Sequence, residues 1–338
     1  AGVRSLLELI ELGKMSHKSL RETVRPSGLV SADRLVDVYE AHFPDEGLRG
    51  ASVHLVKSFG SKGQGPGELL HIGYLAVGGA GADERVAVCD YKNKRVLVFH
   101  VETGECVASV GTEGNAPGQF QRPRGLAFDK QGLLIVTDRE LNRVQVFDHD
   151  GEFLHGFGRS GAGPGEFFKP SGVAVNEQGD IIVCDTYNHR VQVFRPNGHF
   201  VLAFGTSGAG PSELGVPKGV AVGPDGCIVI VDSLNARVQV YSPYGTHTRT
   251  IGSQGHGPGE FQKPYGVAVG LCGEILVADW GRHDVQVFSR EGTLLQSIGA
   301  EGDSKVEVRI PNGVAIDAQG RIFVGNMPSG VLNVLMLA

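Results

Sequence analysis

One set of side chains in this sequence suits ligand binding, because it combines Lys and Arg with Tyr, Trp and His at recurring positions. The set comprises Tyr91, Lys92, Lys94, Arg124, Arg139, Tyr187, His189, Lys218, Tyr265, Trp280, Arg282 and His283. Basic groups interleaved with aromatic rings suit single-stranded RNA, since bases stack on the rings and the cations follow the phosphates. The same mixture is typical of protein hot spots, which favour Tyr, Trp and Arg. We therefore expect recognition of a protein or peptide partner, with single-stranded RNA binding as the alternative.

Glycine-rich segments such as residues 161–167 and 255–261 superficially look like phosphate-binding loops. A dinucleotide fingerprint needs a strand before it and a helix after it, whereas strand-forming residues flank these segments on both sides. We expect turns that set the spacing of a repeat, with Phe120, Phe167 and Phe261 packed between its copies. The sequence also contains no tight spacing motif of a metalloprotease or a nucleophile elbow. It therefore predicts no cofactor and favours a non-catalytic role.

The candidate residues belong to an internal repeat. Asp138, Asp185, Asp232 and Asp279 lie 47 residues apart, and Asn326 continues the series. Each copy holds four short runs of β-branched and aromatic residues separated by Gly, Pro, Asn and Asp, which is typical of strands joined by turns. One such sheet cannot bury both of its faces, so neighbouring copies must stack. A four-stranded repeat of this length indicates a β-propeller.

The two ends of the repeat region predict how the ring closes. The first copy is less regular: Asp90 stands for the repeated Asp, and Gly73 stands for the marker glycine that is Gly125, Gly172 and Gly219 in later copies. The sixth copy ends after its third strand, at residues 331–337. Residues 52–59 have the form of a fourth strand with no first three strands before it. Pairing this strand with the last copy removes exposed sheet edges. Residues 52–338 are therefore predicted to form an all-β, six-bladed β-propeller of four-stranded antiparallel blades, closed by the N-terminal strand.

Residues 1–51 differ in kind from the repeats. Apolar residues at helical spacing, first around Leu6 and Ile10 and then from Leu35 to Phe43, predict two short helices. We expect this helical extension to pack on the propeller or on a second copy of the chain, which would make a homo-oligomer. A truncated link to an upstream module is the alternative.

The amino-acid composition limits the kinds of partner and the cellular compartment that we expect for this chain. The formal net charge of -6 disfavours general attraction to nucleic acid or anionic membranes but leaves room for a local basic patch. No apolar run reaches the roughly 18 residues of a membrane-spanning helix. The five cysteines form no Cys-x-x-Cys pair, so neither a disulfide framework nor a structural zinc site is indicated. We expect a cytoplasmic protein without membrane association.

The repeat resembles the NHL family. The third copy reads Asp185, then Asn188, His189 and Arg190, and then Val-Gln-Val-Phe, and related runs recur through residues 52–338. The resemblance implies a six-bladed propeller similar to the substrate-recognition or RNA-binding domain of tripartite-motif NHL proteins. Those proteins carry a RING, a B-box and a coiled coil upstream, and this sequence has no such Cys/His pattern. Ubiquitin transfer by this chain itself is therefore not expected.

NHL-like repeats also resemble the propeller of the amidating lyase, which uses histidines from several blades around zinc. His189 and His283 occupy equivalent positions two blades apart, but Lys94 holds that position in the first copy. Only two of the three candidate ligands are therefore present, although His71 could approach from the first copy. A metal-dependent lyase or hydrolase of the propeller type is the second alternative.

Antiparallel pairing predicts where the candidate residues gather. The start of a first strand lies beside the end of the second strand, so two loops open on the same side of the ring. We call them the leading loop, before the first strand, and the 2–3 loop, between the second and third strands; the candidate residues occupy these loops. Within each blade, an Arg five residues after the Asp, as in Asp90 and Arg95, is expected to pair with it across the 2–3 loop.

Overall fold

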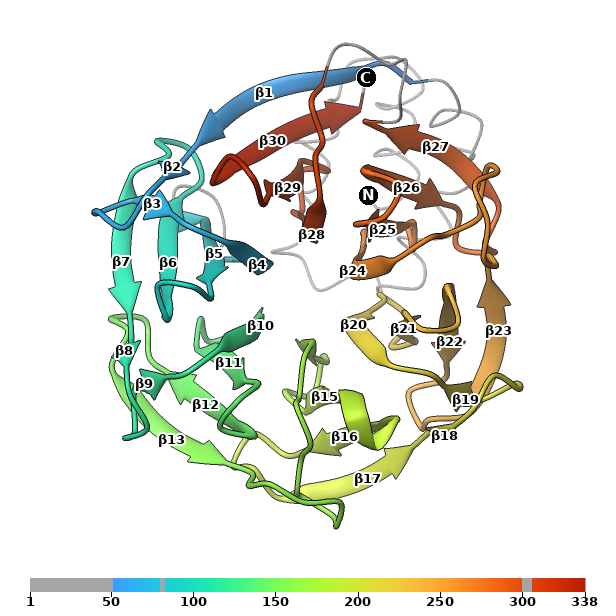
Figure 1. Cartoon of the computed structure of the whole chain (residues 1–338), viewed down its shortest axis with the longest axis horizontal. Coiled ribbons are helices and arrows are strands. Elements are labelled where there is room, and N and C mark those ends of the chain that lie inside the picture. Colours follow the sequence, from blue (N-terminus) through green and yellow to red (C-terminus); the bar gives the residue numbers. More distant parts are fainter. Residues whose placement is uncertain (1–50, 80–82, 300–305, 338) are drawn as a thin grey trace, which may run out of the picture. The chain divides into compact units, whose positions relative to one another are not determined.

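The computed structural model describes residues 51–79, 83–299 and 306–337. In this part of the chain, six four-stranded antiparallel sheets surround a central axis (Figure 1). The predicted all-β, six-bladed propeller is therefore confirmed. The helical extension expected over residues 1–51 lies, apart from residue 51, outside the described residues.

Each blade runs from an innermost first strand to an outermost fourth strand (Figure 1). Blade one consists of β4 (Ile72–Gly78), β5 (Arg85–Asp90), β6 (Arg95–His100) and β7 (Cys106–Val110). Blade two consists of β10 (Pro123–Phe128), β11 (Leu134–Asp138), β12 (Arg143–Phe147) and β13 (Phe153–Phe157). Blade three consists of β14 (Val173–Val175), β15 (Ile181–Asp185), β16 (Arg190–Phe194) and β17 (Phe200–Phe204), with the 3-10 turn η3 (Thr186–Asn188) in its 2–3 loop.

The remaining blades repeat this order. Blade four consists of β20 (Pro217–Val222), β21 (Ile228–Asp232), β22 (Arg237–Tyr241) and β23 (His247–Ile251). Blade five consists of β24 (Pro264–Val269), β25 (Ile275–Asp279), β26 (Asp284–Phe288) and β27 (Leu294–Ile298). Blade six consists of β28 (Pro311–Ile316), β29 (Ile322–Asn326), β30 (Val331–Leu337) and β1 (Val53–Phe59). Connections between blades carry short parallel pairs: β2 (Ser61–Lys62) with β3 (Glu68–Leu69), β8 (Thr112–Glu113) with β9 (Gln119–Phe120), and β18 (Thr206–Ser207) with β19 (Glu213–Leu214).

The ring closes through blade six, as the sequence predicts. Strand β1 pairs antiparallel with β30, and Val53 and Phe59 lie opposite Leu337 and Leu332. The first strands contact one another in the cyclic order β4, β10, β14, β20, β24 and β28, and β28 returns to β4. On the side away from the leading loops, Arg321 of blade six forms ion pairs with Glu84 and Glu102 of blade one. Contacts made by the two ends of the repeat region therefore close the six blades into a continuous ring.

Apolar side chains fill the spaces between blades. The described residues contain six buried clusters, and each cluster joins two neighbouring blades. Phe120, for example, is fully buried with Val96 of blade one and Val136 of blade two. Phe167 and Phe261 are equally buried at the corresponding places, which confirms the packing predicted for them. Burial of a side chain of this size stabilises the fold by roughly 1.5–3 kcal/mol.

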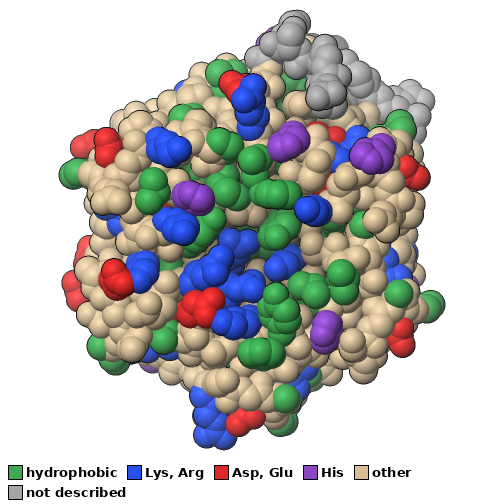
Figure 2. Space-filling model, in the orientation of Figure 1, with side chains coloured by type: hydrophobic (Ala, Val, Ile, Leu, Met, Phe, Trp, Pro, Cys, Tyr) green, Lys and Arg blue, Asp and Glu red, His purple; other side chains and the backbone are tan. Residues whose placement is uncertain are grey.

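The leading loops and 2–3 loops open on one face of the ring, which Figure 2 shows in space-filling form. Backbone hydrogen bonds join the two loops within a blade. The amide of Arg139 donates to the carbonyl of Arg122 at 3.0 Å, and the amide of Trp280 donates to the carbonyl of Lys263 at 3.0 Å. We call this side the loop face.

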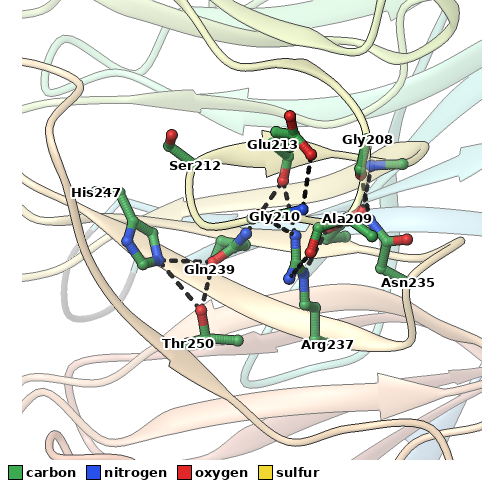
Figure 3. Close-up of polar contacts among 12 residues, drawn as sticks. Gly208, Ala209, Gly210, Ser212, Glu213, Asn235, Arg237, Gln239, His247 and Thr250 are labelled. Atoms are coloured by element: carbon green, nitrogen blue, oxygen red, sulfur yellow. Dashed lines mark hydrogen bonds and ion pairs between the residues drawn. The ribbon is translucent and has the colours of Figure 1, made fainter.

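A recurring polar network fixes these loops to the blades. In blade four, the fully buried carboxylate of Asp232 accepts hydrogen bonds from the backbone amide of Gly215 at 2.6 Å and from Nε of Arg237 at 2.9 Å. The Arg237 guanidinium also donates to the carbonyl oxygen of Glu213 at 2.9 Å, and Gln239 donates to the same oxygen at 3.1 Å (Figure 3). One buried carboxylate thus accepts a hydrogen bond from the leading loop. It also orients the arginine that binds a carbonyl oxygen of the connection from the preceding blade.

The predicted pairing of this Asp with the Arg five residues later is confirmed in three blades. The Nε to Oδ2 distances are 3.5 Å for Arg95 and Asp90, 2.8 Å for Arg190 and Asp185, and 2.9 Å for Arg237 and Asp232. In blade two, Arg143 lies opposite Asp138 in the register but directs its guanidinium to the carbonyl oxygens of Asn115, Ala116 and Gln119. Blade five has Asp284 where this arginine is expected, and Arg282, two residues earlier, forms an ion pair with Asp284 at 3.1 Å.

The glycine-rich connections are turns closed by their own carboxylates. Glu166 accepts a hydrogen bond from the amide of Gly163 at 2.9 Å, and Glu213 accepts one from the amide of Gly210 at 2.7 Å. Because these backbone amides already have an anionic partner, the loops do not offer them to a phosphate.

Candidate functional site

One position, which lies in the first strand of four blades and just before β14 in blade three, places a side chain near the central axis. It holds Arg124, Ser171, Lys218, Tyr265 and Asn312, and a glycine follows each of them. A Cβ atom at Gly125 would lie only 2.2 Å from the carbonyl oxygen of Ser171, and one at Gly219 would lie 2.5 Å from the carbonyl oxygen of Tyr265. Glycine therefore permits neighbouring blades to approach closely at the axis. This approach brings the preceding side chains together.

Blade one reverses the order and places a tyrosine across the axis. Gly73 and Tyr74 stand where the other blades have a side chain followed by glycine. The Tyr74 hydroxyl donates to the carbonyl of Tyr265 in blade five at 3.1 Å and accepts a bond from Oγ of Ser171 in blade three at 3.5 Å. Burial raises the pKa of Tyr74, so its hydroxyl stays protonated. The sequence prediction omitted Tyr74, although the reversed order of glycine and large residue was a usable signal.

Four cations lie near enough to one another for their charges to interact, and we call Arg122, Arg124, Arg139 and Lys218 the cationic cluster. The Arg124 guanidinium carbon lies 5.6 Å from the ring centre of Tyr74, 5.5 Å from that of Tyr91 and 5.7 Å from that of Tyr265. Tyr265 belongs to blade five, so Arg124 of blade two reaches across the axis. In Figure 2, Lys and Arg side chains accordingly gather over the centre of the loop face.

Two members of the cationic cluster, Arg124 and Lys218, are buried, and the cluster is poorly neutralised. Arg124 is only 6% exposed and Lys218 only 8%, and Nε of Arg124 has no hydrogen-bond partner. Burial, together with the charges of Arg139, Arg124 and Arg122, lowers the pKa of Lys218 to about 7. Within the described residues, no carboxylate forms an ion pair with Arg124, Arg139 or Lys218. The nearby Glu140 pairs with Arg122 at 3.6 Å and with Lys169.

Cations cover the aromatic rings at the centre of the loop face. Tyr91 lies under Arg122 and Arg124, each 5.5 Å from its ring centre. Tyr265 lies under Arg124 and under Lys218, whose Nζ is 5.2 Å away. Nζ of Lys263 lies 4.8 Å from the ring centre of Trp280. Such contacts hold the rings in place and engage the faces on which a base would stack.

Three large side chains from the loops of blades three and four are exposed, and we call Phe168, Tyr187 and Leu234 the apolar patch. Their exposed fractions are 46%, 43% and 69%. The rings of Phe168 and Tyr187 lie 5.7 Å apart, and Leu234 occupies in blade four the 2–3 loop position that Tyr187 occupies in blade three. The Arg139 guanidinium carbon is 5.4 Å from the Tyr187 ring centre, so Arg139 joins the patch to the cluster.

The other predicted site residues lie apart from this cluster and contact neighbouring loops. Lys94, His189 and His283 share one left-handed position, with φ of 55°, 53° and 61°. Lys94 pairs with Glu113, His189 contacts the carbonyl of Gly215, and Nδ1 of His283 accepts the amide of Ile310 at 3.1 Å. Arg282 pairs with Asp284, and Lys92 is exposed. These contacts give Lys94, His189, Arg282 and His283 roles in holding the blades together.

The geometry does not assemble the ligand set that the metal alternative needs. His71 contacts the Tyr91 hydroxyl at 2.8 Å, while His189 and His283 each bind a loop of the following blade. Across residues 51–79, 83–299 and 306–337, no group of three or more His, Cys, Asp or Glu side chains is arranged to hold a metal ion. The same residues include no helix long and apolar enough to cross a membrane.

Comparison with protein families supports the identification of the repeat. The NHL repeat model matches residues 120–147 and 167–194, and a model described as a 6-bladed beta-propeller matches residues 220–272. The E3 ubiquitin-protein ligase TRIM71 of Rattus norvegicus is 46% identical over 56 residues, which are 17% of this chain and 6% of that protein. Protein wech of Drosophila melanogaster is 56% identical over 43 residues, 13% of this chain and 5% of that protein. The matched segments thus span only a small part of these relatives.

Solved structures agree with the fold. A streptogramin B lyase aligns with a TM-score of 0.59 and 13% identity, covering 85% of this chain and 98% of that chain. A gluconolactonase from Xanthomonas campestris aligns with a TM-score of 0.59 and 19% identity, covering 80% of this chain and 87% of that chain. At these identities the likeness shows the fold alone. Residues 120–147 and 167–194 therefore match NHL repeats, and both segments lie within a six-bladed β-propeller.

Proposed function

We propose that this chain is a non-catalytic recognition module that binds a protein or peptide partner through the loop face. The observation that carries the proposal is that the apolar patch and the cationic cluster adjoin, with Arg139 in contact with Tyr187. Exposed apolar side chains next to Arg and Tyr are the composition of protein hot spots. A partner would cover the patch and place acidic groups over the cluster.

The relatives are compatible with such a role. The rat protein is named an E3 ubiquitin-protein ligase, and an enzyme of that kind needs a part that holds its substrate. Fold alone does not assign a function, so the proposal depends on the loop face and not on the names of the relatives. The five cysteines are free thiols, and two of them, Cys89 and Cys184, are buried. We accordingly propose that binding takes place in the reducing cytoplasm.

Affinity purification with matched variants tests this function. We would compare the wild-type chain, Tyr187→Ala and Tyr244→Ala after treatment of the extract with RNase, and quantify the recovered proteins by mass spectrometry. Tyr244 is 83% exposed and lies in the turn between β22 and β23, at the opposite end of the blade. A protein retained by the wild type and by Tyr244→Ala but lost from Tyr187→Ala supports the proposal. Equal recovery by all three contradicts it.

Single-stranded RNA is the second candidate, because four cations gather on a chain that is acidic overall. Cations lie over the rings of Tyr91, Tyr265 and Tyr187 alike, however, and of these three rings only that of Tyr187 is exposed. Stacking of successive bases needs open ring faces, which is why RNA ranks second. Retention of a single-stranded oligonucleotide near 150 mM salt, lost on replacing Arg124 and Lys218 together by Glu, would favour RNA. Unchanged affinity of that double variant would exclude this site.

A further inference from the structure

We propose that the cationic cluster is a binding site for a single oxyanion group, a carboxylate or a phosphate, carried by the peptide partner. The inference rests on the proposed function, because the partner supplies the anion. It adds the chemical class of the group recognised and the place where that group lies, above Tyr74 at the centre of the ring.

Convergence of the cations is the first argument. Arg122, Arg124 and Arg139 come from blade two and Lys218 from blade four, yet the charges of all three arginines act on the Lys218 ammonium. Like charges that are removed from water repel one another strongly. Glu140 is engaged by Arg122 and Lys169, so the described residues leave Arg124, Arg139 and Lys218 without a carboxylate partner. A bound oxyanion would neutralise this excess positive charge.

Unused hydrogen-bonding capacity is the second argument. Nε of Arg124 is buried without a partner, and among the described arginines whose Nε lacks a partner only Arg124 is more than nine-tenths buried. Buried donors in folded proteins nearly always find an acceptor, so an orphaned guanidinium nitrogen calls for an explanation. Guanidinium and ammonium groups form their strongest hydrogen bonds with carboxylates and phosphates. A ligand oxyanion beside Arg124 and Lys218 meets that need.

Tyr74 limits what enters the centre. Its ring lies under Arg124, and its hydroxyl bridges blades three and five through Ser171 and Tyr265. The tyrosine therefore forms a floor across the axis. Because Tyr74 closes the centre of the ring, a single terminal anionic group fits above it better than a polymer that passes through the ring along its axis.

Protonation of Lys218 makes the site sensitive to pH. The groups that face its ammonium are Arg122, Arg124 and Arg139, the ring of Tyr265 and the buried thiol of Cys184. The arginines keep their charge at all accessible pH values. A bound anion favours the charged ammonium, so binding strengthens below pH 7 and weakens as the pH rises above it.

Sulfate is a suitable probe, because its charge is constant between pH 5.5 and 8.5. We would titrate sulfate into the full chain by calorimetry, at an ionic strength held constant with chloride, and compare wild type, Lys218→Met and Lys130→Met. Lys130 is an exposed lysine at the opposite end of blade two, paired with Glu177. We expect one sulfate per chain, at least tenfold weaker binding by Lys218→Met, and unchanged binding by Lys130→Met. The affinity of the wild type should fall about tenfold between pH 6 and pH 8.

Two results would overturn the inference: no saturable sulfate binding by the wild type, or equal binding by all three proteins. Competition of sulfate with the blocked amino acids N-acetyl-aspartate amide and N-acetyl-phosphoserine amide then distinguishes carboxylate from phosphate as the source. Failure of the anion site is separable from failure of the proposed function. If Tyr187→Ala loses its partner while sulfate does not bind, recognition stands and the anion site is wrong.

Discussion

At the scale of single residues, the buried charge of Lys218 lowers the stability of the folded protein while it provides a cation for the proposed anion site. Its ammonium is buried beside three guanidinium groups, which lowers its pKa to about 7, whereas an unfolded lysine titrates near 10.4. Between these values the unfolded chain binds the proton more tightly than the folded chain. The stability of the protein therefore rises with pH across this window, and below pH 7 the full cost of the buried charge remains.

Lys218→Met should accordingly stabilise the unliganded protein. The increase in melting temperature should be largest below pH 7 and should shrink as the pH rises toward 10, because the cost of the buried charge disappears over that range. Thermal unfolding between pH 6 and pH 10 measures this, with the exposed Lys130→Met as the control that leaves the curve unchanged. Destabilisation by Lys218→Met at pH 6 would contradict the account.

Sequence reasoning identified Arg124, Lys218 and Tyr265 because the regular repeat shows which position changes while its surroundings stay constant. It missed Tyr74 because blade one breaks the register of the marker glycine. It also grouped His189 and His283 with the binding residues, since position within a loop does not reveal which side chains turn toward the next blade. The cation–π contacts at the centre depend on side chains from opposite blades, and no local pattern encodes them.

At the scale of strands and loops, the buried Asp at the end of the second strand in blades one to five organises the loop face. Asp232 joins the leading loop to Arg237, and Arg237 holds the preceding connection. Blade six uses Asn326 instead, whose Oδ1 accepts the amide of Arg309 at 2.9 Å while its Nδ2 donates to Glu307 at 3.1 Å. The loop contact therefore needs an oxygen acceptor, whereas the arginine contact needs the charge.

Asp232→Ala should lower the free energy of unfolding by about 3–5 kcal/mol, because it leaves a buried guanidinium and backbone amides without their acceptor. Asp232→Asn should cost less, about 1–3 kcal/mol, because it keeps an acceptor for Gly215. Urea unfolding monitored by fluorescence or circular dichroism gives both values. Equal losses for the two variants would show that the loop contact contributes nothing.

The four strands of each blade were predictable from sequence, because period, turn residues and β-branched runs agree in the regular copies. The hydrogen-bond and ion-pair partners of individual arginines were not predictable. The Arg143 guanidinium turns to carbonyl oxygens of the connection, and Arg282 replaces an arginine that blade five lacks. Both outcomes depend on how two loops pack, which spacing along the chain does not specify.

At the scale of the whole ring, stability depends on closure by β1. Phe59 of this strand is buried in the cluster between blades six and one, with its ring 5.4 Å from that of Phe99. Loss of the Phe59 ring would therefore leave a cavity between the last blade and the first.

Phe59→Ala should therefore destabilise the protein by about 3–5 kcal/mol. Val56→Ala, in the same strand but 48% exposed, should change stability by no more than about 0.5 kcal/mol. Urea unfolding curves of the two variants measure the difference. Similar curves would mean that β1 does not close the ring in solution.

Site-specific photo-crosslinking tests the central claim, that a polypeptide partner binds the loop face, most directly. Benzoylphenylalanine would replace Tyr187 on the loop face and, separately, Tyr244 at the opposite end of the blades, and each protein would be irradiated in living cells. We predict a discrete crosslinked polypeptide from position 187 that resists RNase and is absent from position 244. Crosslinks that vanish with RNase, or equal crosslinks from both positions, would contradict the claim.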